Sequence, residues 1–148
     1  MRAVVQRVSE ASVAIDGKVH ARIGKGYVIL LGMKDGDTKA AAEYLADKCS
    51  YLRVFEDSQG KMNLSLHEVG GEALVVSQFT LYGDAQKGNR PGFADAARPE
   101  EAEPLYEHFV QRMRSVVGAS RVQTGVFRAM MDVTIVNSGP VTILIESK

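Results

Sequence analysis

The sequence predicts an α/β fold: one domain over residues 1–148, with mixed and antiparallel β-sheets that form a barrel-like core and two main helices. Three observations support this prediction. Apolar residues alternate with polar ones between residues 13 and 23, several later segments are continuous apolar runs, and two stretches carry apolar residues at helical spacing. The length suits one domain of ordinary size.

Several strands are predicted from these patterns. Asp16-Gly17 is a strong two-residue hairpin signal between two alternating segments. Residues 27–31 form an unbroken apolar run, as expected of a strand buried on both faces. Further strands are expected over 53–55, 73–81 and 122–124, and over 133–136 and 141–145 with a tight turn between them.

Both helices carry recognisable signals. The first follows Asp37 or Thr38, either of which can cap it. The second begins at Pro99, has three glutamates near its positive end, and ends at Gly118. Their apolar stripes are Ala41, Leu45, Cys49 and Leu52 in the first helix, and Ala102, Leu105, Phe109, Met113 and Val116 in the second. The region before the second helix, residues 82–98, is predicted to be a long loop, and a loop of that length favours a functional role.

Composition excludes several classes of protein. Hydrophobic residues make up 45% and charged residues 24%, which are values of a globular chain. Eighteen basic and 18 acidic residues argue against a broadly basic nucleic-acid binder, although a local basic patch stays possible. The single cysteine, Cys49, excludes an intrachain disulfide framework and a cysteine-based zinc site. No signal peptide or membrane span is seen, so we expect a cytoplasmic protein. We expect no metal and no cofactor.

The familiar catalytic motifs are absent. The chain has neither a phosphate-binding loop of the G-x-x-x-x-G-K-[ST] type nor a G-x-S-x-G elbow. The three histidines, His20, His67 and His108, are scattered and do not have ligand spacing. Cys49 lies on an apolar helical stripe, so a buried and inert thiol is the better interpretation.

Two polar segments interrupt otherwise apolar β regions. In Ser77-Gln78-Phe79-Thr80-Leu81, an extended chain would place Gln78 and Thr80 on one face. Such polar groups either line a site or mark a strand that emerges into solvent. In Asn137-Ser138-Gly139-Pro140, Pro140 removes a backbone donor and Gly139 removes a side chain. From the residues alone, an ordinary tight turn is the simpler explanation.

Taken together, these segments resemble the D-aminoacyl-tRNA deacylases, also called the D-tyrosyl-tRNA deacylase family. The resemblance covers essentially the whole chain. It is carried by residues 1–8 (MRAVVQRV), 52–57 (LRVFED), 60–65 (GKMNLS), 76–81 (VSQFTL), 87–91 (KGNRP) and 137–142 (NSGPVT). The ordered pair of S-Q-F-T and N-x-G-P-V-T is the most specific part.

The resemblance implies a homodimeric hydrolase that cleaves the ester between a D-amino acid, or glycine on a mismatched tRNA, and the terminal adenosine of tRNA. It implies a cis Gly139-Pro140 bond that reaches into the partner's active site and rejects L-amino acids, with Arg7 helping to hold this loop. The matching site floor is Ser77, Gln78, Phe79 and Thr80, and the adenosine pocket is matched by Ala102, Phe127 and Met131. Lys87 and Arg90, in the long loop, are expected to approach phosphates of the tRNA acceptor end.

Three positions depart from the family pattern. Arg128 replaces a residue that is commonly small, Met130 replaces a frequent acidic residue, and Ser138 replaces a common aspartate. They leave the details of the adenosine pocket open. Two alternative functions also stay open: a non-catalytic tRNA- or DNA-binding module, and a hydrolase of small esters with a threonine or serine nucleophile. The second needs a base beside Thr80, and the sequence identifies none.

Overall fold

The computed structural model describes residues 1–148. Its strands are β1 (Arg2–Ile15), β2 (Lys18–Ile23), β3 (Gly26–Gly32), β4 (Arg53–Glu56), β5 (Met62–Ser65), β6 (Glu72–Ser77), β7 (Val122–Thr124) and β8 (Asp132–Glu146). Its helices are α1 (Lys39–Tyr51) and α2 (Pro99–Val117), with short 3-10 turns η1 (Phe79–Tyr82) and η2 (Ala119–Arg121). No helix is both long and apolar enough to cross a bilayer.

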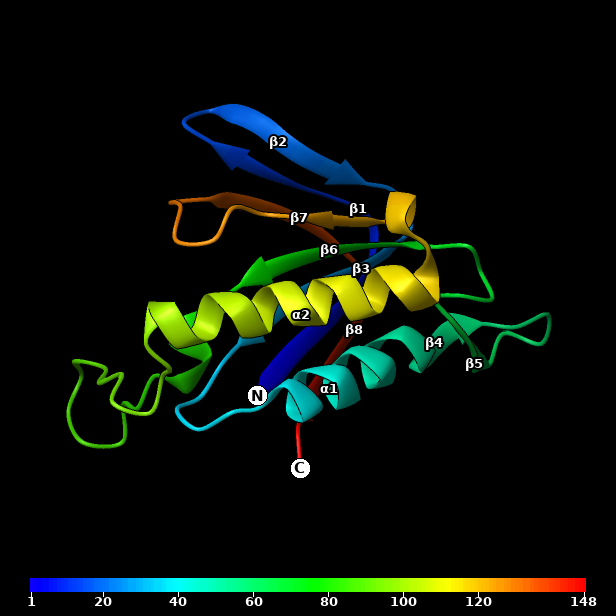
Figure 1. Cartoon of the computed structure of the whole chain (residues 1–148). Helices are drawn as coiled ribbons and strands as arrows, with labels where there is room; N and C mark the ends of the chain where they lie inside the picture. Colours follow the sequence, from blue (N-terminus) through cyan, green and yellow to red (C-terminus); the bar gives the residue numbers. More distant parts are fainter.

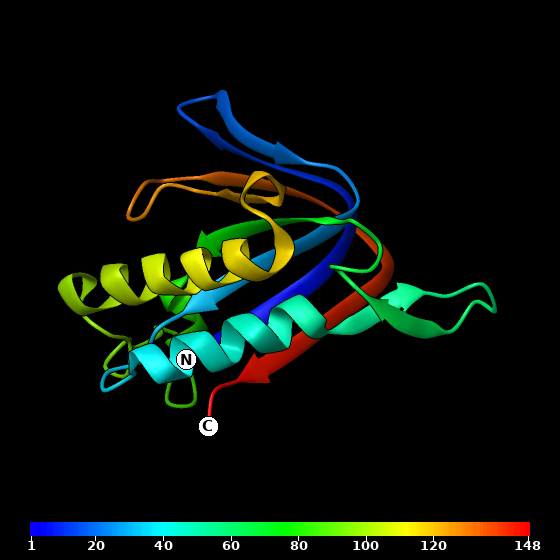
Figure 2. The same cartoon turned by 45° about the vertical axis from the view of Figure 1, so that its right-hand side comes forward.

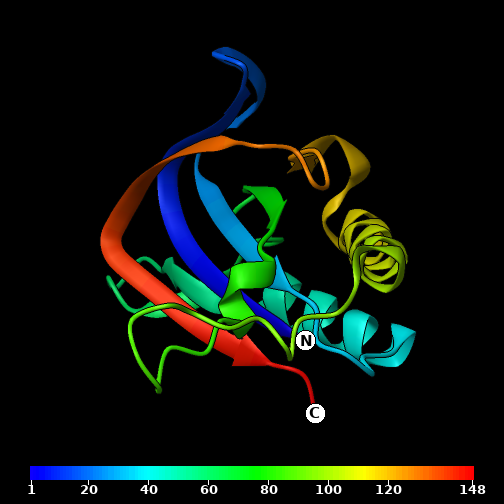
Figure 3. The ribbon, with the colours of Figure 1, turned by 90° about the vertical axis from the view of Figure 1, so that its left-hand side faces the viewer.

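One mixed sheet organises the fold. Its strands run in the order β2-β1-β3-β6-β7, and β8 pairs with β1 along most of its length. The β3–β6 and β6–β7 pairs are parallel, whereas the pairs made by β1 are antiparallel. Seen along the strands, the sheet curls until it nearly closes on itself (Figure 3). The predicted α/β fold with a barrel-like core and two main helices is confirmed.

The two helices lie side by side on one face of this sheet (Figures 1 and 2). The hydroxyl of Thr38 accepts a hydrogen bond from the Ala41 amide at 3.2 Å, so Thr38 is the cap of α1. Pro99 begins α2 and Gly118 follows its last residue, as predicted. Both helices turn apolar faces toward the sheet.

The curl of the sheet produces two hydrophobic cores. The larger lies between the sheet and the helices, and the smaller lies inside the curl. Strand β6 serves both, because Ala73 and Val75 join the larger core while Leu74 and Val76 join the smaller. This double burial explains why the sequences of β3 and β6 are continuously apolar.

Three details differ from the predictions. The strand expected over 73–81 ends at Ser77, because β3 ends at Gly32 and β7 at Thr124 and no neighbour continues the ladder; η1 follows. The period-two alternation expected for Gln78 and Thr80 therefore stops there. Strand β5, which the sequence did not indicate, pairs with β4 as a small hairpin.

The third difference concerns residues 133–145, where no tight turn occurs. Strand β8 is continuous, because β1 is long enough to pair with both of its apolar halves. Gln6 pairs with Thr142 and Val8 with Asn137, so residues 138–141 stand opposite Arg7 alone. We call these four residues the β8 bulge. Pro140 cannot donate a ladder hydrogen bond, which suits a bulged position.

Candidate active site

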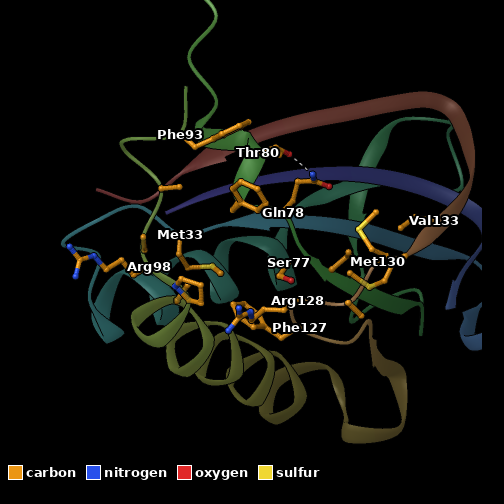
Figure 4. A pocket seen from close by; sticks show the side chains of 18 residues that line it. Met33, Ser77, Gln78, Thr80, Phe93, Arg98, Phe127, Arg128, Met130 and Val133 are labelled. Carbon is orange, nitrogen blue, oxygen red and sulfur yellow. Dashed lines mark hydrogen bonds between the residues drawn. The ribbon is translucent and has the colours of Figure 1, made fainter. Parts of the chain in front are cut away.

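A cavity of about 750 Å³ lies where β6 ends and η1 begins (Figure 4). Its walls come from both cores and from the segment that precedes α2. Seven of the ten predicted catalytic and substrate-binding residues line it: Ser77, Gln78, Phe79, Thr80, Ala102, Phe127 and Met131. Residues that are distant in sequence therefore meet at one edge of the sheet, as sites of α/β folds commonly do.

The η1 turn is anchored from two sides. The Gln78 amide donates to the Leu31 carbonyl at 2.8 Å, which extends the β3–β6 ladder by one bond. Arg2 donates from Nη1 to the Leu81 carbonyl at 2.7 Å, and its guanidinium lies 4.9 Å from the centre of the Tyr82 ring. These contacts fix the direction in which Thr80 faces. The sequence had not identified Arg2 as a residue that supports the site.

Two polar side chains face each other on the cavity floor. The Gln78 side-chain amide donates to the Thr80 hydroxyl, as the dashed line in Figure 4 marks. Phe79, which is 57% exposed, makes an edge contact with Phe93 at 5.1 Å between ring centres. As the first two residues of a 3-10 turn, Phe79 and Thr80 have amide N–H groups with no acceptor inside that turn.

The apolar wall is held by two further contacts. The Tyr106 hydroxyl donates to the Val75 carbonyl at 2.8 Å, and the Tyr106 ring packs against Phe127 at 5.7 Å. Burial raises the pKa of Tyr106, so its hydroxyl keeps its proton and donates. A Cβ at Gly125 would lie 2.6 Å from the Met131 sulfur, so this glycine lets Met131 approach the wall closely.

The charge of the cavity is one-sided. Among its 18 lining residues the only charged ones are Arg98 and Arg128, and there is no histidine, aspartate, glutamate, lysine or cysteine. His20 and His67 are exposed elsewhere, and His108 bonds Glu43 at 2.8 Å. Nowhere in the chain do three or more metal-ligating side chains gather. No protein side chain in this cavity can act as a general base at neutral pH.

The β8 bulge does not line this cavity. Its Gly139-Pro140 peptide is cis, as predicted. Arg7 lies beside it and donates from Nε to the Ser138 carbonyl at 3.1 Å and from Nη1 to the Val54 carbonyl at 2.6 Å. The three predicted residues Arg7, Gly139 and Pro140 thus gather at a second place, away from the cavity of the same chain.

The remaining candidates lie outside both places. Lys87 and Arg90 are exposed in the loop after η1, which closes through paired hydrogen bonds between Asp84 and Gly92. Cys49 is fully buried in α1, and burial raises its pKa to about 12, as expected of an inert thiol. Several lining residues carried no signal in the sequence, because small and apolar side chains of a loop look like filler: Met33, Phe93, Ala96 and Ala97.

Comparison with known proteins identifies the class to which this fold and site belong. The family model described as D-Tyr-tRNA(Tyr) deacylase matches residues 4–146. Two proteins named D-aminoacyl-tRNA deacylase, from Symbiobacterium thermophilum and Desulfatibacillum aliphaticivorans, are each 59% identical over 148 residues. Both alignments cover 100% of this chain, with 97% and 100% of the relative. The chain belongs to the D-Tyr-tRNA(Tyr) deacylase family.

Two solved structures share the fold of this chain. A c-Myc DNA unwinding element binding protein superposes with a TM-score of 0.95 at 43% identity, covering 100% of this chain and 99% of that one. A probable eukaryotic D-amino acid tRNA deacylase superposes with a TM-score of 0.86 and 98% coverage of both chains. At 19% identity, the second comparison supports the fold alone.

Proposed function

We propose that this protein hydrolyses the ester bond of D-aminoacyl-tRNA and releases free tRNA and the D-amino acid. The observation that carries the proposal is that residues matched to the family's site floor and nucleoside pocket meet in one cavity. The full-length similarity to proteins named D-aminoacyl-tRNA deacylase supports the same reaction.

The terminal adenosine of the tRNA is the group that we assign to the apolar wall. The cavity volume of about 750 Å³ is within the range of small-ligand sites. Phe127 and Met131 offer flat and polarisable contacts to a purine, and the small side chain of Ala102 leaves room in the same cavity. The ester of the same nucleoside then lies toward Gln78 and Thr80.

Water is the proposed nucleophile. A threonine hydroxyl is a weak nucleophile without a base, and the cavity contains none. The ribose hydroxyl next to the ester is held within reach by the substrate itself, so it can position or assist the attacking water. Thr80 and Gln78 shape and polarise the site, and the amide N–H groups of Phe79 and Thr80 are the proposed donors to the oxyanion.

The β8 bulge is the proposed filter for chirality, acting from a second copy of the chain. Bare carbonyls of Gly139 and Pro140 would read the amine and Cα that every D-amino acid shares. An L side chain would collide with this segment, so selectivity comes from exclusion, and glycine, which has no side chain, would be hydrolysed as well.

The surface around the bulge suits a homodimer. Along β8, outward-facing residues alternate with half-buried ones, and Val136 and Leu144 are 42% and 58% exposed on either side of the bulge. Strand β8 pairs only with β1, which leaves its other edge without a strand. Contact through this face would carry the bulge of one protomer toward the cavity of its partner.

The deciding experiment uses matched D- and L-aminoacyl-tRNA. We expect release of the D-amino acid and of glycine, with the L-ester left intact. Equal release of both enantiomers would contradict the proposed filter. A free D-amino-acid ester, supplied without tRNA, tests the small-ester hydrolase, which would keep its rate.

Binding of DNA is a second candidate function, because a protein with a similar structure is a c-Myc DNA unwinding element binding protein. The exposed cations Lys87 and Arg90 provide a local basic surface on a chain without net charge. Tight binding of DNA together with no hydrolysis of any aminoacyl-tRNA would favour this candidate over the deacylase.

A further inference from the structure

The cavity has an unusual charge for a chain with no net charge. Its two charged lining residues are both arginines, and they come from different segments, one before α2 and one after β7. Neither side chain takes part in an ion pair or a hydrogen bond of the chain, although four ion pairs form elsewhere. An apolar cavity with unpaired cations suits a ligand that is largely apolar and carries an anionic group.

The two arginines are oriented differently. Arg128 lies next to Phe127, above α2, on the wall to which we assign the adenosine (Figure 4). Arg98 lies at the opposite end, and its guanidinium points away from the other lining side chains (Figure 4). Only Arg128 is placed to reach an anionic group that is attached to a nucleoside packed against Phe127.

The backbone at Arg128 is unfavourable for an arginine. Arg128 has a φ of +67°, and the Ala129 amide donates to the Val126 carbonyl at 3.1 Å. This is the pattern of a turn whose third residue has positive φ, a position that favours glycine or asparagine. A side chain held in that conformation carries a cost in stability, and such costs are concentrated at functional positions.

We propose that Arg128 binds the phosphate that links the terminal adenosine to the preceding nucleotide of the substrate. The proposal rests on the proposed function, because it takes the nucleoside at Phe127 as given. A guanidinium presents a planar pair of donors that matches two phosphate oxygens. The contact is remote from the ester, so it acts on binding and not on the chemical step.

Two minimal substrates test this assignment: the D-aminoacyl ester of adenosine, and the same ester with a 5′-methylphosphate. For the wild type we expect kcat/KM to be about tenfold higher with the phosphate, the size expected for a hydrogen bond between charged groups. The difference should appear in KM with kcat unchanged. Arg128→Gly and Arg128→Asn should remove the preference, and Arg128→Lys should keep part of it.

Arg128→Gly also distinguishes a role in phosphate binding from a role in stability. Since glycine relieves the positive φ, we expect this variant to melt at a higher temperature than the wild type while it binds the phosphate ester less tightly. Arg22→Ala is the matched control, because Arg22 is exposed on β2, forms no ion pair and lies outside the cavity. It should leave the phosphate preference unchanged.

The outcomes separate the two proposals. Equal rates on the two esters, or loss of the preference in Arg98→Ala and not in Arg128→Gly, would overturn the role of Arg128 and leave the deacylase in place. If only full-length D-aminoacyl-tRNA is cleaved, an unchanged KM of Arg128→Gly on that substrate would overturn it. Absence of hydrolysis on all three substrates would overturn the proposed function and this assignment together.

Discussion

The cavity at the end of β6 and the β8 bulge are built in opposite ways. The cavity is mainly apolar and open, and the polar pair on its floor, Gln78 and Thr80, lies where the chain continues after strand β6 has ended. The bulge is exposed at Gly139 and Pro140 and is closely held, because Arg7 ties it to β4 through hydrogen bonds to the Ser138 and Val54 carbonyls. One region is shaped to admit a ligand, and the other is shaped to resist displacement.

This difference corresponds to the two tasks of a stereoselective hydrolase, which are to accept D substrates and to reject L substrates. Accepting any D side chain requires a site that makes few contacts with it, whereas rejecting an L side chain requires a surface that does not yield. A soft surface would adapt to the wrong substrate. The chain places the two properties on different strands, and we propose that a second protomer brings them together.

The largest expected effect tests the chemistry of the cavity. We expect a substrate that lacks the ribose hydroxyl next to the ester to be cleaved at least ~10²-fold more slowly, which is the size of a lost acid–base contribution. Thr80→Ala should keep measurable activity on the normal substrate, because the proposed attack is made by water. Single-turnover release of the amino acid measures both effects. A covalent adduct on Thr80, with normal cleavage of the deoxy substrate, would overturn the assignment.

The next effect concerns the bulge. Gly139 has a φ of +122°, and a Cβ there would lie 2.8 Å from Nη2 of Arg7 and 3.0 Å from Cγ2 of Val141. Gly139→Ala must therefore displace the Arg7 guanidinium that holds the bulge, or shift the bulge itself, and it also strains the backbone at a positive φ. We expect the ratio of D to L hydrolysis to fall by about 10-fold or more, since a steric filter loses selectivity when its position changes. The measurement is kcat/KM for both enantiomers.

A matched control exists for the strain that this substitution introduces. Gly36 also has a positive φ, +82°, but a Cβ there would meet nothing within 4 Å. Gly36→Ala should cost about 1 kcal/mol of stability, as expected for a residue forced into the left-handed region, and should leave the D/L ratio unchanged. A similar loss of selectivity in both variants would show that general destabilisation, and not the bulge, explains the result.

Much of the fold could be predicted because its signals are local. The hairpin at Asp16-Gly17, the double burial of β3 and the boundaries of α2 each follow from residues that are neighbours in the sequence. The end of β6 could not be predicted in this way. It depends on where β3 and β7 stop, which is a property of the sheet and not of the residues after Ser77.

The candidate site likewise contains residues that the sequence could identify and residues that it could not. The polar floor was visible because Gln78 and Thr80 interrupt an apolar run, whereas Ala96 and Met33 line the cavity without any pattern that distinguishes them from filler. The β8 bulge shows most clearly what local sequence cannot predict. Its residues suggested a turn, but the register with β1 makes them a protrusion from a continuous strand.

The smallest expected effect lies outside both regions. Lys87 and Arg90 are exposed in the loop after η1 and line no part of the cavity. If they contact phosphates of the acceptor end, each contact releases counterions, so the double alanine variant should lower the slope of log Kd against log salt by about two units. We expect kcat and the D/L ratio to stay unchanged, because neither residue reaches the ester or the proposed filter. Filter binding of a non-hydrolysable aminoacyl-tRNA analogue at several salt concentrations gives the slope. An unchanged slope would remove the loop from the tRNA interface, while a changed D/L ratio would connect the loop to the filter and end the separation between binding and selection proposed above.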